Sequence, residues 1–384
     1  MHSFSLRDIT AHILRHTFGE SWGSSTLKKG SMVMKRICRE DQKFELMRML
    51  NVYSRARGVS IRDEANHTAF LSELLRKFET SKKNPILIHG LRTEAMFAHI
   101  AATMGHCVAI KTEDAGDVYL MDSGLRIPDF RILTSAGQEL FVEVKNHHPA
   151  NPTDDFKMNK DYFESLKRYA VVFNRGLYFA IYWSQWKLWS LVRQDRFDTS
   201  THAYRLSIEN AMMRNEMNII GDCLLATVSP LELRLFSDPN STRIVKADGT
   251  VKFKIAAARL FAGGKEVDNS LEKRIAWFFM NYGNWIGTPG YTEVCEGEII
   301  SVGLTVAPEE RANPNERFET VGQMSQMLSR QFNEITVGSE GVDLLIPKSE
   351  PEDLGVMIPS DYKGEKLPLW RFYQQLSIRE EESP

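Results

Sequence analysis

Cysteine is scarce in this sequence, and its cysteines stand far apart. They are Cys38, Cys107, Cys223 and Cys295, so no close pair is present of the kind that begins a zinc site. We interpret these residues as reduced, mostly structural thiols.

Long apolar runs are missing as well. No stretch reaches the roughly 18 consecutive apolar residues that a membrane-spanning helix requires, and even the apolar stretch 176–191 is interrupted by polar residues such as Lys187. Residues 1–19 include Arg7 and Asp8, so they lack the unbroken apolar core of a signal peptide. We therefore expect a cytoplasmic protein with no membrane-spanning segment.

A strong net charge is also absent. The net charge of −2 gives the chain no global attraction to nucleic acid, so any such binding must come from local patches. The sequence has no glycine-rich phosphate loop ending in Gly-Lys-Ser/Thr, and it lacks the motifs His-Glu-x-x-His and Gly-x-Ser-x-Gly. An ATP-driven motor is therefore not supported by this chain.

The length of the chain favours more than one domain. It has 384 residues, whereas single cores usually stop growing at about 250 to 300 residues. With 42% hydrophobic and 26% charged residues, its composition is close to the average of folded proteins. Hydrophobic spacing predicts a helical N-terminal segment (1–83), a mixed α/β core (84–229) and an α+β C-terminal domain (230–384), which could bind nucleic acid or a partner.

One predicted helix of the C-terminal domain has two interpretations. The stretch 321–332 has helical apolar spacing and carries Ser325, Ser329 and Arg330 on its other side. It could lie in a DNA groove as the second helix of a winged helix-turn-helix, or pack on its own domain as a surface helix.

The segment 84–229 alternates between helices and strands, which predicts a mixed central sheet flanked by helices. Its two best strands flank the turn Ser135-Ala136-Gly137-Gln138, a short glycine-containing link that suits a β-hairpin. In chain order, the predicted elements are a helix at 92–104, strands at 107–111, 118–121, 127–133 and 140–145, a helix at 160–173, and strands at 177–183 and 186–192.

The predicted hairpin brings two acids and a lysine together. Side chains alternate across a strand, so Glu143 and Lys145 project from one face, while Val142 and Val144 project from the other. A four-residue turn pairs positions whose numbers sum to about 272 or 273, which places Asp129 beside Glu143 or Val144. We therefore expect the acids and the lysine on one face and the apolar residues on the opposite, buried face.

This set of side chains suits one kind of chemistry. Two neighbouring carboxylates repel each other and raise their own pKa values unless a cation lies between them. Mg²⁺ prefers oxygen ligands and often takes one or two carboxylates together with waters and phosphate oxygens. Lys145 could help to polarise the attacking water and offset charge on the phosphate, which predicts phosphodiester hydrolysis. The alternative is an ordinary hairpin edge with exposed charges.

The same residues resemble a known superfamily. Pro128-Asp129, followed after thirteen residues by Glu143-Val144-Lys145, is similar to the motif of the PD-(D/E)xK nucleases, which include restriction endonucleases and Holliday-junction resolvases. The resemblance covers roughly 91–192 and implies a restriction endonuclease-like fold. It also implies that Asp129, Glu143 and Lys145 are catalytic, and that Asp129 and Glu143 bind Mg²⁺, for which Mn²⁺ can substitute.

The resemblance extends to the helices on either side of the motif. In that superfamily a helix ahead of the first strand often supplies a further acid, and Glu94 occupies the matching place as a fourth catalytic residue; Asp117 or Asp122 could replace it. The helix after the motif often carries Gln-x-x-x-Tyr, and here Tyr169 is kept while Ser165 replaces the glutamine. The nucleic-acid contacts predicted on this helix are Lys160, Lys167 and Tyr169.

The function that the resemblance implies is a Mg²⁺-dependent DNA endonuclease, acting in bacterial or phage genome defence, including antiviral defence, or in a mobile element. DNA is the expected partner, and a homodimer or a partner subunit is expected because one active site cuts one strand. Two alternatives stay open at this point. The chain could be a non-catalytic DNA-binding or assembly protein on a nuclease-like scaffold, or a nuclease that acts on RNA or branched DNA.

Overall fold

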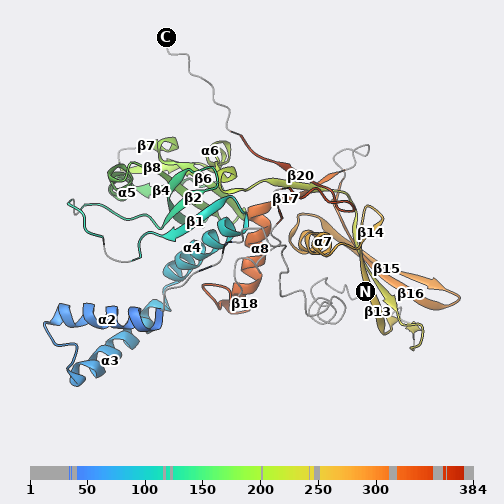
Figure 1. The fold of residues 1–384 in the computed structure, drawn as a ribbon, viewed down its shortest axis with the longest axis horizontal. Helices are drawn as coiled ribbons and strands as arrows, with labels where there is room; N and C mark the ends of the chain where they lie inside the picture. The colour runs from blue at the N-terminus through green and yellow to red at the C-terminus, as the bar shows by residue number, and fades with distance from the viewer. Residues whose placement is uncertain are drawn as a thin grey trace, which may run out of the picture.

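The computed structural model describes residues 34, 36, 41–115, 118–121, 124–199, 202–241, 243–245, 251–310, 318–348, 358–359 and 361–375. Two five-stranded sheets lie at opposite ends of the protein, with helices α4 (Pro85–Thr103) and α8 (Met324–Thr336) between them (Figure 1). The helices α2 (Asp41–Arg57) and α3 (Glu64–Ser81) form a hairpin that stands away from this body. Most of the predicted helical segment before residue 41 lies outside the described residues.

The first sheet has the strand order β1-β2-β3-β5-β6. Strands β3 and β5 are parallel, and helix α5 (Lys160–Val172) lies in the connection between them, as a parallel pair requires. The other pairs are antiparallel, so the predicted mixed sheet is confirmed, whereas the strand predicted at 118–121 is wrong because that segment has no regular structure. The strands are β1 (Cys107–Thr112), β2 (Phe130–Thr134), β3 (Glu139–His147), β5 (Gly176–Trp183) and β6 (Leu188–Arg193).

The hairpin of β2 and β3 has the predicted register. Phe130 pairs with Val142 and Leu133 pairs with Glu139, so partner numbers sum to 272 in each case. The turn closes because the backbone N–H of Thr134 donates to the carbonyl of Gln138 at 2.9 Å. Gly137 has a φ of 79°, in the left-handed region that glycine adopts without a steric penalty.

Both faces of β3 are covered by helices. On one face Val142 and Val144 belong to a core that includes Phe97 of α4. On the other face Phe141 belongs to a second core with Phe163 of α5, whose apolar residues recur at helical spacing and so face the sheet together. Both faces of β3 are therefore buried, including the face that carries Glu143.

The second sheet is antiparallel, with the order β14-β13-β10-β16-β15, and α7 (Ser270–Tyr282) is buried against it through residues such as Phe279. Its strands are β10 (Leu231–Ser237), β13 (Ile255–Ala262), β14 (Lys265–Val267), β15 (Ile286–Cys295) and β16 (Glu298–Ala307). The smaller elements are β4 (Phe156–Asn159), β7 (Asp198–Thr199), β8 (Ala203–Leu206), α6 (Ile208–Met213), β11 (Ile244–Val245), β12 (Val251–Lys252), β18 (Val337–Gly338), β19 (Gly341–Val342) and 3-10 turns at Gln194–Arg196 and Met217–Ile220.

Segments on both sides of the predicted boundary at 229 and 230 are interleaved. Strand β9 (Leu224–Thr227) pairs with β17 (Glu319–Gln323) and with β20 (Leu369–Phe372). The buried Asp222, just before β9, accepts hydrogen bonds from the backbone N–H of Ser325 at 2.9 Å and from its hydroxyl at 2.6 Å. These contacts tie the first turn of α8 to the α/β core, so one hydrophobic core extends across the predicted boundary.

Helix α8 is an interior helix, so its interpretation as a DNA-reading helix is wrong. Ser325 and Ser329 are 1% and 0% exposed, and the indole N–H of Trp189 donates to the Ser329 hydroxyl at 2.9 Å. Arg330 donates to the backbone carbonyls of Tyr282 and Gly283. The side of the helix that carries Ser325, Ser329 and Arg330 therefore contacts other parts of the chain and is not available to a DNA groove.

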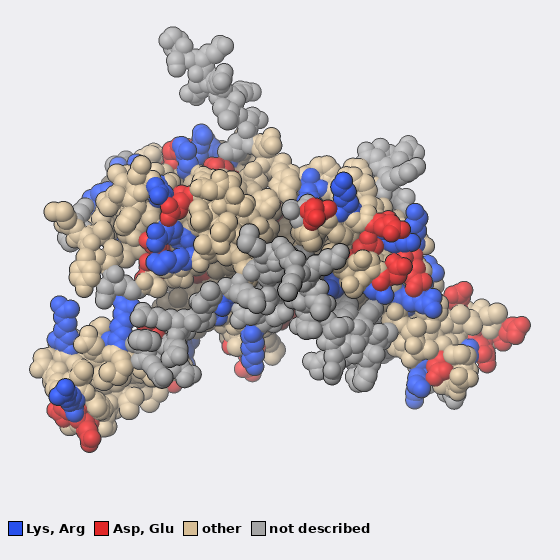
Figure 2. Space-filling model, viewed as in Figure 1, with Lys and Arg blue, Asp and Glu red and all other residues tan. Residues whose placement is uncertain are grey.

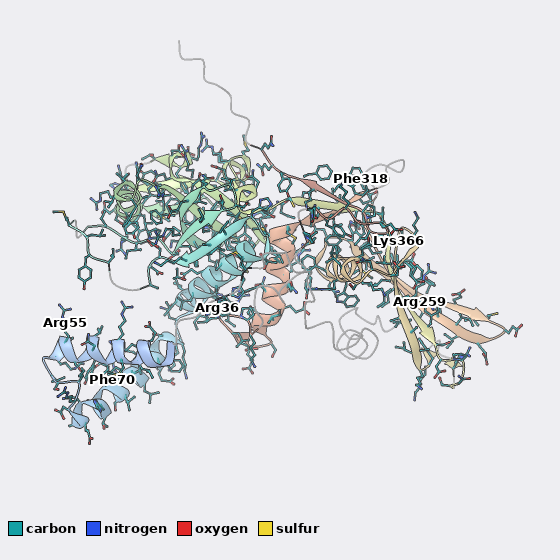
Figure 3. The ribbon with its side chains drawn as sticks, viewed as in Figure 1. Arg36, Arg55, Phe70, Arg259, Phe318 and Lys366 are labelled. Carbon is teal, nitrogen blue, oxygen red and sulfur yellow. The ribbon has the colours of Figure 1, made fainter. Side chains whose placement is uncertain are left out.

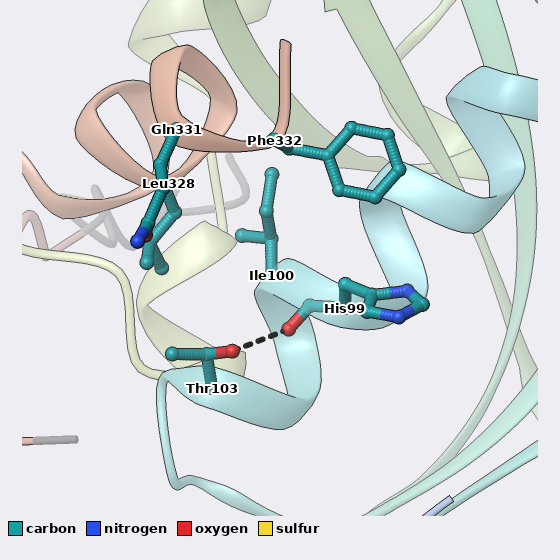
Figure 4. A pocket seen from close by; sticks show the side chains of 6 residues that line it. All are labelled: His99, Ile100, Thr103, Leu328, Gln331 and Phe332. Atoms are coloured by element: carbon teal, nitrogen blue, oxygen red, sulfur yellow. Dashed lines mark hydrogen bonds between the residues drawn. The ribbon is translucent and has the colours of Figure 1, made fainter. Parts of the chain in front are cut away.

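A small gap lies in the seam between α4 and α8. Figure 4 shows Ile100 and Phe332 facing one another across it, and the hydroxyl of Thr103 donating to the carbonyl of His99 at 2.7 Å. Its volume is about 10 Å³, which is about the space that one water molecule requires. We interpret this gap as a packing feature between two helices.

The visible surface carries mixed charge. Lys and Arg side chains lie beside Asp and Glu side chains on the face in Figure 2. Exposed ion pairs of the described chain include Arg175 with Glu139 and Arg259 with Glu266. Because charges of both signs are interspersed, any attraction of nucleic acid to this face must come from individual basic side chains rather than from a broad positive patch. Among the described helices, none is both long and apolar enough to cross a membrane.

Candidate active site

Glu143 is a buried acid in the middle of the first sheet. It lies on β3, where it pairs with Phe179 of β5, and it is 1% exposed. Its Oε1 atom accepts hydrogen bonds from the ammonium of Lys145 and the hydroxyl of Tyr162, each at 2.5 Å. Its Oε2 atom is buried and has no hydrogen-bond partner among the described residues. A buried carboxylate oxygen without a partner is costly, so this atom is suited to a cation.

Asp129 lies immediately before β2 and reaches across the hairpin. Its Oδ2 atom accepts a hydrogen bond from the backbone N–H of Val144 at 2.6 Å, which holds the carboxylate beside β3 as the register predicted. Burial raises the pKa of Asp129 to about 8, and the negative charge of Glu143 adds to this, while Lys145 opposes it. Without a cation, Asp129 therefore keeps its proton up to about pH 8, because burial and the charge of Glu143 disfavour its ionised form.

Lys145 supplies the positive charge of the site. Burial alone would lower the pKa of Lys145, but the charges of Glu143 and Asp129 raise it above its ordinary value. The side chain therefore remains an ammonium at neutral pH. Its chemical role is that of a fixed positive charge and hydrogen-bond donor, because it has no lone pair to accept a proton.

Two further acids belong to the same electrostatic cluster. Burial raises the pKa of Glu94 on α4, and the charges of Asp114 and Glu143 raise it further, while Lys145 lowers it. Partial burial and then Glu143 raise the pKa of Asp114, in the loop after β1. The helix acid expected from the sequence is thus brought within electrostatic reach of Glu143. Asp117 and Asp122, the two acids that the sequence offered as alternatives to Glu94, lie outside the described residues.

Asp114 is a residue that the sequence did not single out. It reaches the site because β1 and β2 pair with Thr112 opposite Phe130, and the backbone N–H of Glu113 donates to the carbonyl of Asp129 at 2.8 Å. The connection between those strands is long, so its register could not be obtained from a turn. The position of Asp114 just after the first strand was the one feature of the sequence that could have indicated its place in the site.

Tyr162 is the second residue that the sequence did not single out. It lies in the first turn of α5, where the side chain of Asn159 caps its backbone N–H at 3.1 Å. Burial raises the pKa of Tyr162 to about 12, with Glu143 adding to the effect, so its hydroxyl stays protonated and donates to Glu143. Together with Lys145, it holds Oε1 of Glu143, while Oε2 has no partner among the described residues.

Tyr169, which was predicted to contact nucleic acid, lies in the core. It is 2% exposed, its hydroxyl donates to Glu113 at 3.0 Å, and its ring packs on Phe141 at 5.2 Å. The prediction is wrong for this residue because α5 turns it toward the sheet. Lys160 is half-buried at the start of α5, and Lys167 is 42% exposed with Glu164 at 3.9 Å. Contacts of these two lysines with nucleic acid stay predictions.

The residues present fit a Mg²⁺ ion that is completed by other ligands. No group of three or more His, Cys, Asp or Glu side chains within the described ranges is arranged to hold a metal alone. Mg²⁺ commonly keeps several waters and takes one or two carboxylates with substrate phosphate oxygens. Glu143, whose Oε2 atom has no partner within the described ranges, and Asp129 provide those two carboxylates.

The raised pKa of Asp129 predicts how stability depends on pH. Between its ordinary value of 3.8 and about 8, folded Asp129 holds a proton that the unfolded chain has released. The free energy of unfolding of the metal-free protein should therefore fall as pH rises through this window. Mg²⁺ should restore stability mainly toward pH 8, where it binds the ionised carboxylates.

Urea unfolding between about pH 5 and pH 9, with and without Mg²⁺, measures this effect. Asp129→Asn serves as the comparison, because its difference from the parent isolates the titration of this one group. Parallel pH curves for the parent and the variant would contradict the assignment of the shift to Asp129.

Comparison with known proteins adds a loose structural likeness. No protein-family model matches the chain, and no curated protein matches it. Hjc, a Holliday junction resolvase from the archaeal hyperthermophile Archaeoglobus fulgidus, overlaps with 35% of this chain and 96% of its own. The two are 14% identical, with a TM-score of 0.27. Because a likeness of this size carries no argument, the function must be inferred from the site itself.

Proposed function

We propose that the protein is a metal-dependent nuclease that hydrolyses phosphodiester bonds of DNA at the site formed by Asp129, Glu143 and Lys145. The observation that carries this proposal is the buried Oε2 atom of Glu143, which has no hydrogen-bond partner in the part of the chain that the structure describes, beside a second buried acid. Other buried polar atoms of the described chain, such as Oε1 of Glu319, also lack a partner; what distinguishes Oε2 of Glu143 is the second buried acid and the ammonium of Lys145 beside it.

Each residue has a distinct role in this proposal. Asp129 and Glu143 would hold Mg²⁺, which supplies positive charge to the phosphate when it is bound. Lys145 offsets the negative charge that develops on the phosphate oxygens in the transition state. Tyr162 keeps the carboxylate of Glu143 in place, and Glu94 is proposed as the further acid of the catalytic set.

The overall reaction adds water across one ester bond of the phosphate. A bond forms between phosphorus and the water oxygen, and the bond from phosphorus to one sugar oxygen breaks. The water releases one proton, and the departing sugar oxygen takes up a proton to become a hydroxyl. Atoms and charge balance without an oxidant or a second substrate.

Cleavage of supercoiled plasmid in Mg²⁺ tests the proposal. The parent should nick the plasmid. Loss of a residue that only supports a metal ligand typically costs roughly 10- to 100-fold in activity. Asp129→Asn should cost more, because it removes a proposed ligand. Asp154→Asn is the matched control, because this exposed acid lies in the loop after β3. Equal nicking by the parent and Asp129→Asn would contradict catalysis and favour a non-catalytic DNA-binding protein.

Matched duplex, branched and single-stranded substrates in DNA and RNA then test the substrate class. Hydrolysis of DNA substrates is the expected result. Cleavage of RNA alone would contradict the proposed substrate, because the enzyme would then require the 2′-hydroxyl or the uracil bases that distinguish RNA from the matched DNA.

A further inference from the structure

Arg126 lies in the loop that leads into β2 and the active site. The loop is tied to α5 at two points. The backbone N–H of Arg126 donates to the carbonyl of Ser165 at 3.2 Å, and the guanidinium of Arg168 donates to the carbonyl of Gly124 at 2.5 Å. The backbone of this exposed residue is therefore held against the helix that carries Tyr162.

The side chain of Arg126 is positioned by the same tyrosine that contacts Glu143. Its guanidinium carbon lies 4.8 Å from the centre of the Tyr162 ring, and the ammonium of Lys145 lies 5.4 Å from that centre. Because the Tyr162 hydroxyl donates to Glu143, one aromatic ring connects two cations to the buried acid. Stacking on the ring orients a side chain that would otherwise be free to rotate in solvent.

Arg126 also differs from Arg131, the arginine on β2. Arg131 forms ion pairs with Glu113 at 3.1 Å and with Glu139 at 3.5 Å. The guanidinium of Arg126 has no ion pair or hydrogen bond to a described residue. A planar guanidinium with its N–H groups unengaged is suited to bidentate contact with a phosphate.

We infer that Arg126 binds a backbone phosphate of the substrate strand next to the phosphate that is cleaved. This inference rests on the proposed function, because it takes the ligand to be DNA in that site. Arg126 would set the position of the strand over Glu143 and Lys145, whereas those residues act on the reacting phosphate.

Binding of a fluorescein-labelled DNA duplex tests this inference. Fluorescence anisotropy is measured in Ca²⁺ between about 0.05 and 0.5 M KCl, where affinity depends on the number of phosphate contacts. The variants are Arg126→Ala, Arg126→Lys and the control Arg259→Ala. Arg259 is the control because it is also an exposed arginine over an aromatic ring, 4.9 Å from that of Phe236, in the second sheet at the other end of the protein (Figure 3); unlike Arg126, it pairs with Glu266.

The expected result is specific to Arg126. Loss of one phosphate contact weakens binding by roughly eightfold at 0.1 M salt and lowers the slope of log affinity against log salt by about one. Arg126→Lys should keep most of the slope, because it retains the charge but not the planar donor pair. Arg259→Ala should bind like the parent, and thermal melts should show both alanine variants folded.

Two outcomes would overturn the inference: a parent chain that binds no duplex, or equal salt slopes for the parent and Arg126→Ala. Failure of the proposed function looks different. A parent chain that binds DNA through Arg126 but leaves it uncut in Mg²⁺ would support the phosphate contact and contradict the nuclease. A parent chain that cleaves DNA, together with an unchanged salt slope in Arg126→Ala, would support the nuclease and contradict the phosphate contact.

Discussion

Glu143→Gln should abolish DNA cleavage, with a loss of about 10³-fold or more in kcat. The substitution keeps the shape of the side chain but removes the carboxylate whose Oε2 atom has no partner in the described chain. It should also remove the stabilisation of the protein by Mg²⁺. The parent should therefore melt at a higher temperature when Mg²⁺ is added, and the variant should not.

Glu139→Gln is the matched control for this prediction. It makes the same chemical change on the same strand, but Glu139 is a partly exposed acid that pairs with Arg175 at 2.6 Å. This control should keep both cleavage and the Mg²⁺ effect on melting. If Glu143→Gln also keeps the Mg²⁺ effect, the ion is held elsewhere, and the role of Glu143 as a ligand is lost.

Lys145→Met should separate catalysis from metal binding. The methionine retains much of the length of the side chain but removes the ammonium, whose raised pKa keeps it charged at neutral pH. A fixed cation that stabilises the transferring phosphate contributes on the order of 10³-fold or more to kcat. Mg²⁺ binding should be as tight as in the parent or tighter, because the variant lacks a positive charge beside the two acids.

Single-turnover cleavage and Mg²⁺ titration followed by melting temperature measure the two effects separately. Lys265→Met is the control, since this exposed lysine lies on β14 of the second sheet. Lys145→Arg should recover part of the rate, because it restores the charge with a different shape. A Lys145→Met protein that cleaves at the parental rate would show that the ammonium has no part in the reaction.

The central hairpin could be predicted from sequence because its information is local. A short turn fixes which residues of the two strands face each other, so Asp129 could be placed beside Glu143 without knowing the rest of the fold. The burial of Glu143 could not be obtained in this way. It depends on α5, which covers the acid-bearing face of β3. The connection from β3 to α5 is not a short turn, so the position of the helix could not be predicted from it.

The residues that the sequence missed reach the site through distant segments. Tyr162 depends on how α5 crosses the sheet, and Asp114 depends on the register of a long connection. Tyr169 was selected by a pattern, although its spacing from Phe163 and Leu166 already placed it on the apolar side of the helix. That spacing was the better guide.

Helix α8 shows a limit of hydrophobic periodicity. The pattern predicted the helix and its apolar side, but small polar residues can be buried when another segment supplies their hydrogen bonds. Asp222 and Trp189 do so for Ser325 and Ser329. Both partners come from the α/β core, which the sequence had assigned to a different domain.

Crystals soaked in Mn²⁺ would locate the bound ion directly through its anomalous scattering. We expect one peak between the two acids, about 2.1 Å from Oε2 of Glu143 and from an oxygen of Asp129, the distance typical of a small divalent cation on oxygen ligands. Oε1 of Glu143 should keep its contacts with Lys145 and Tyr162. Mn²⁺ bound only at other positions, with Oε2 of Glu143 contacting protein atoms alone, would contradict the metal centre.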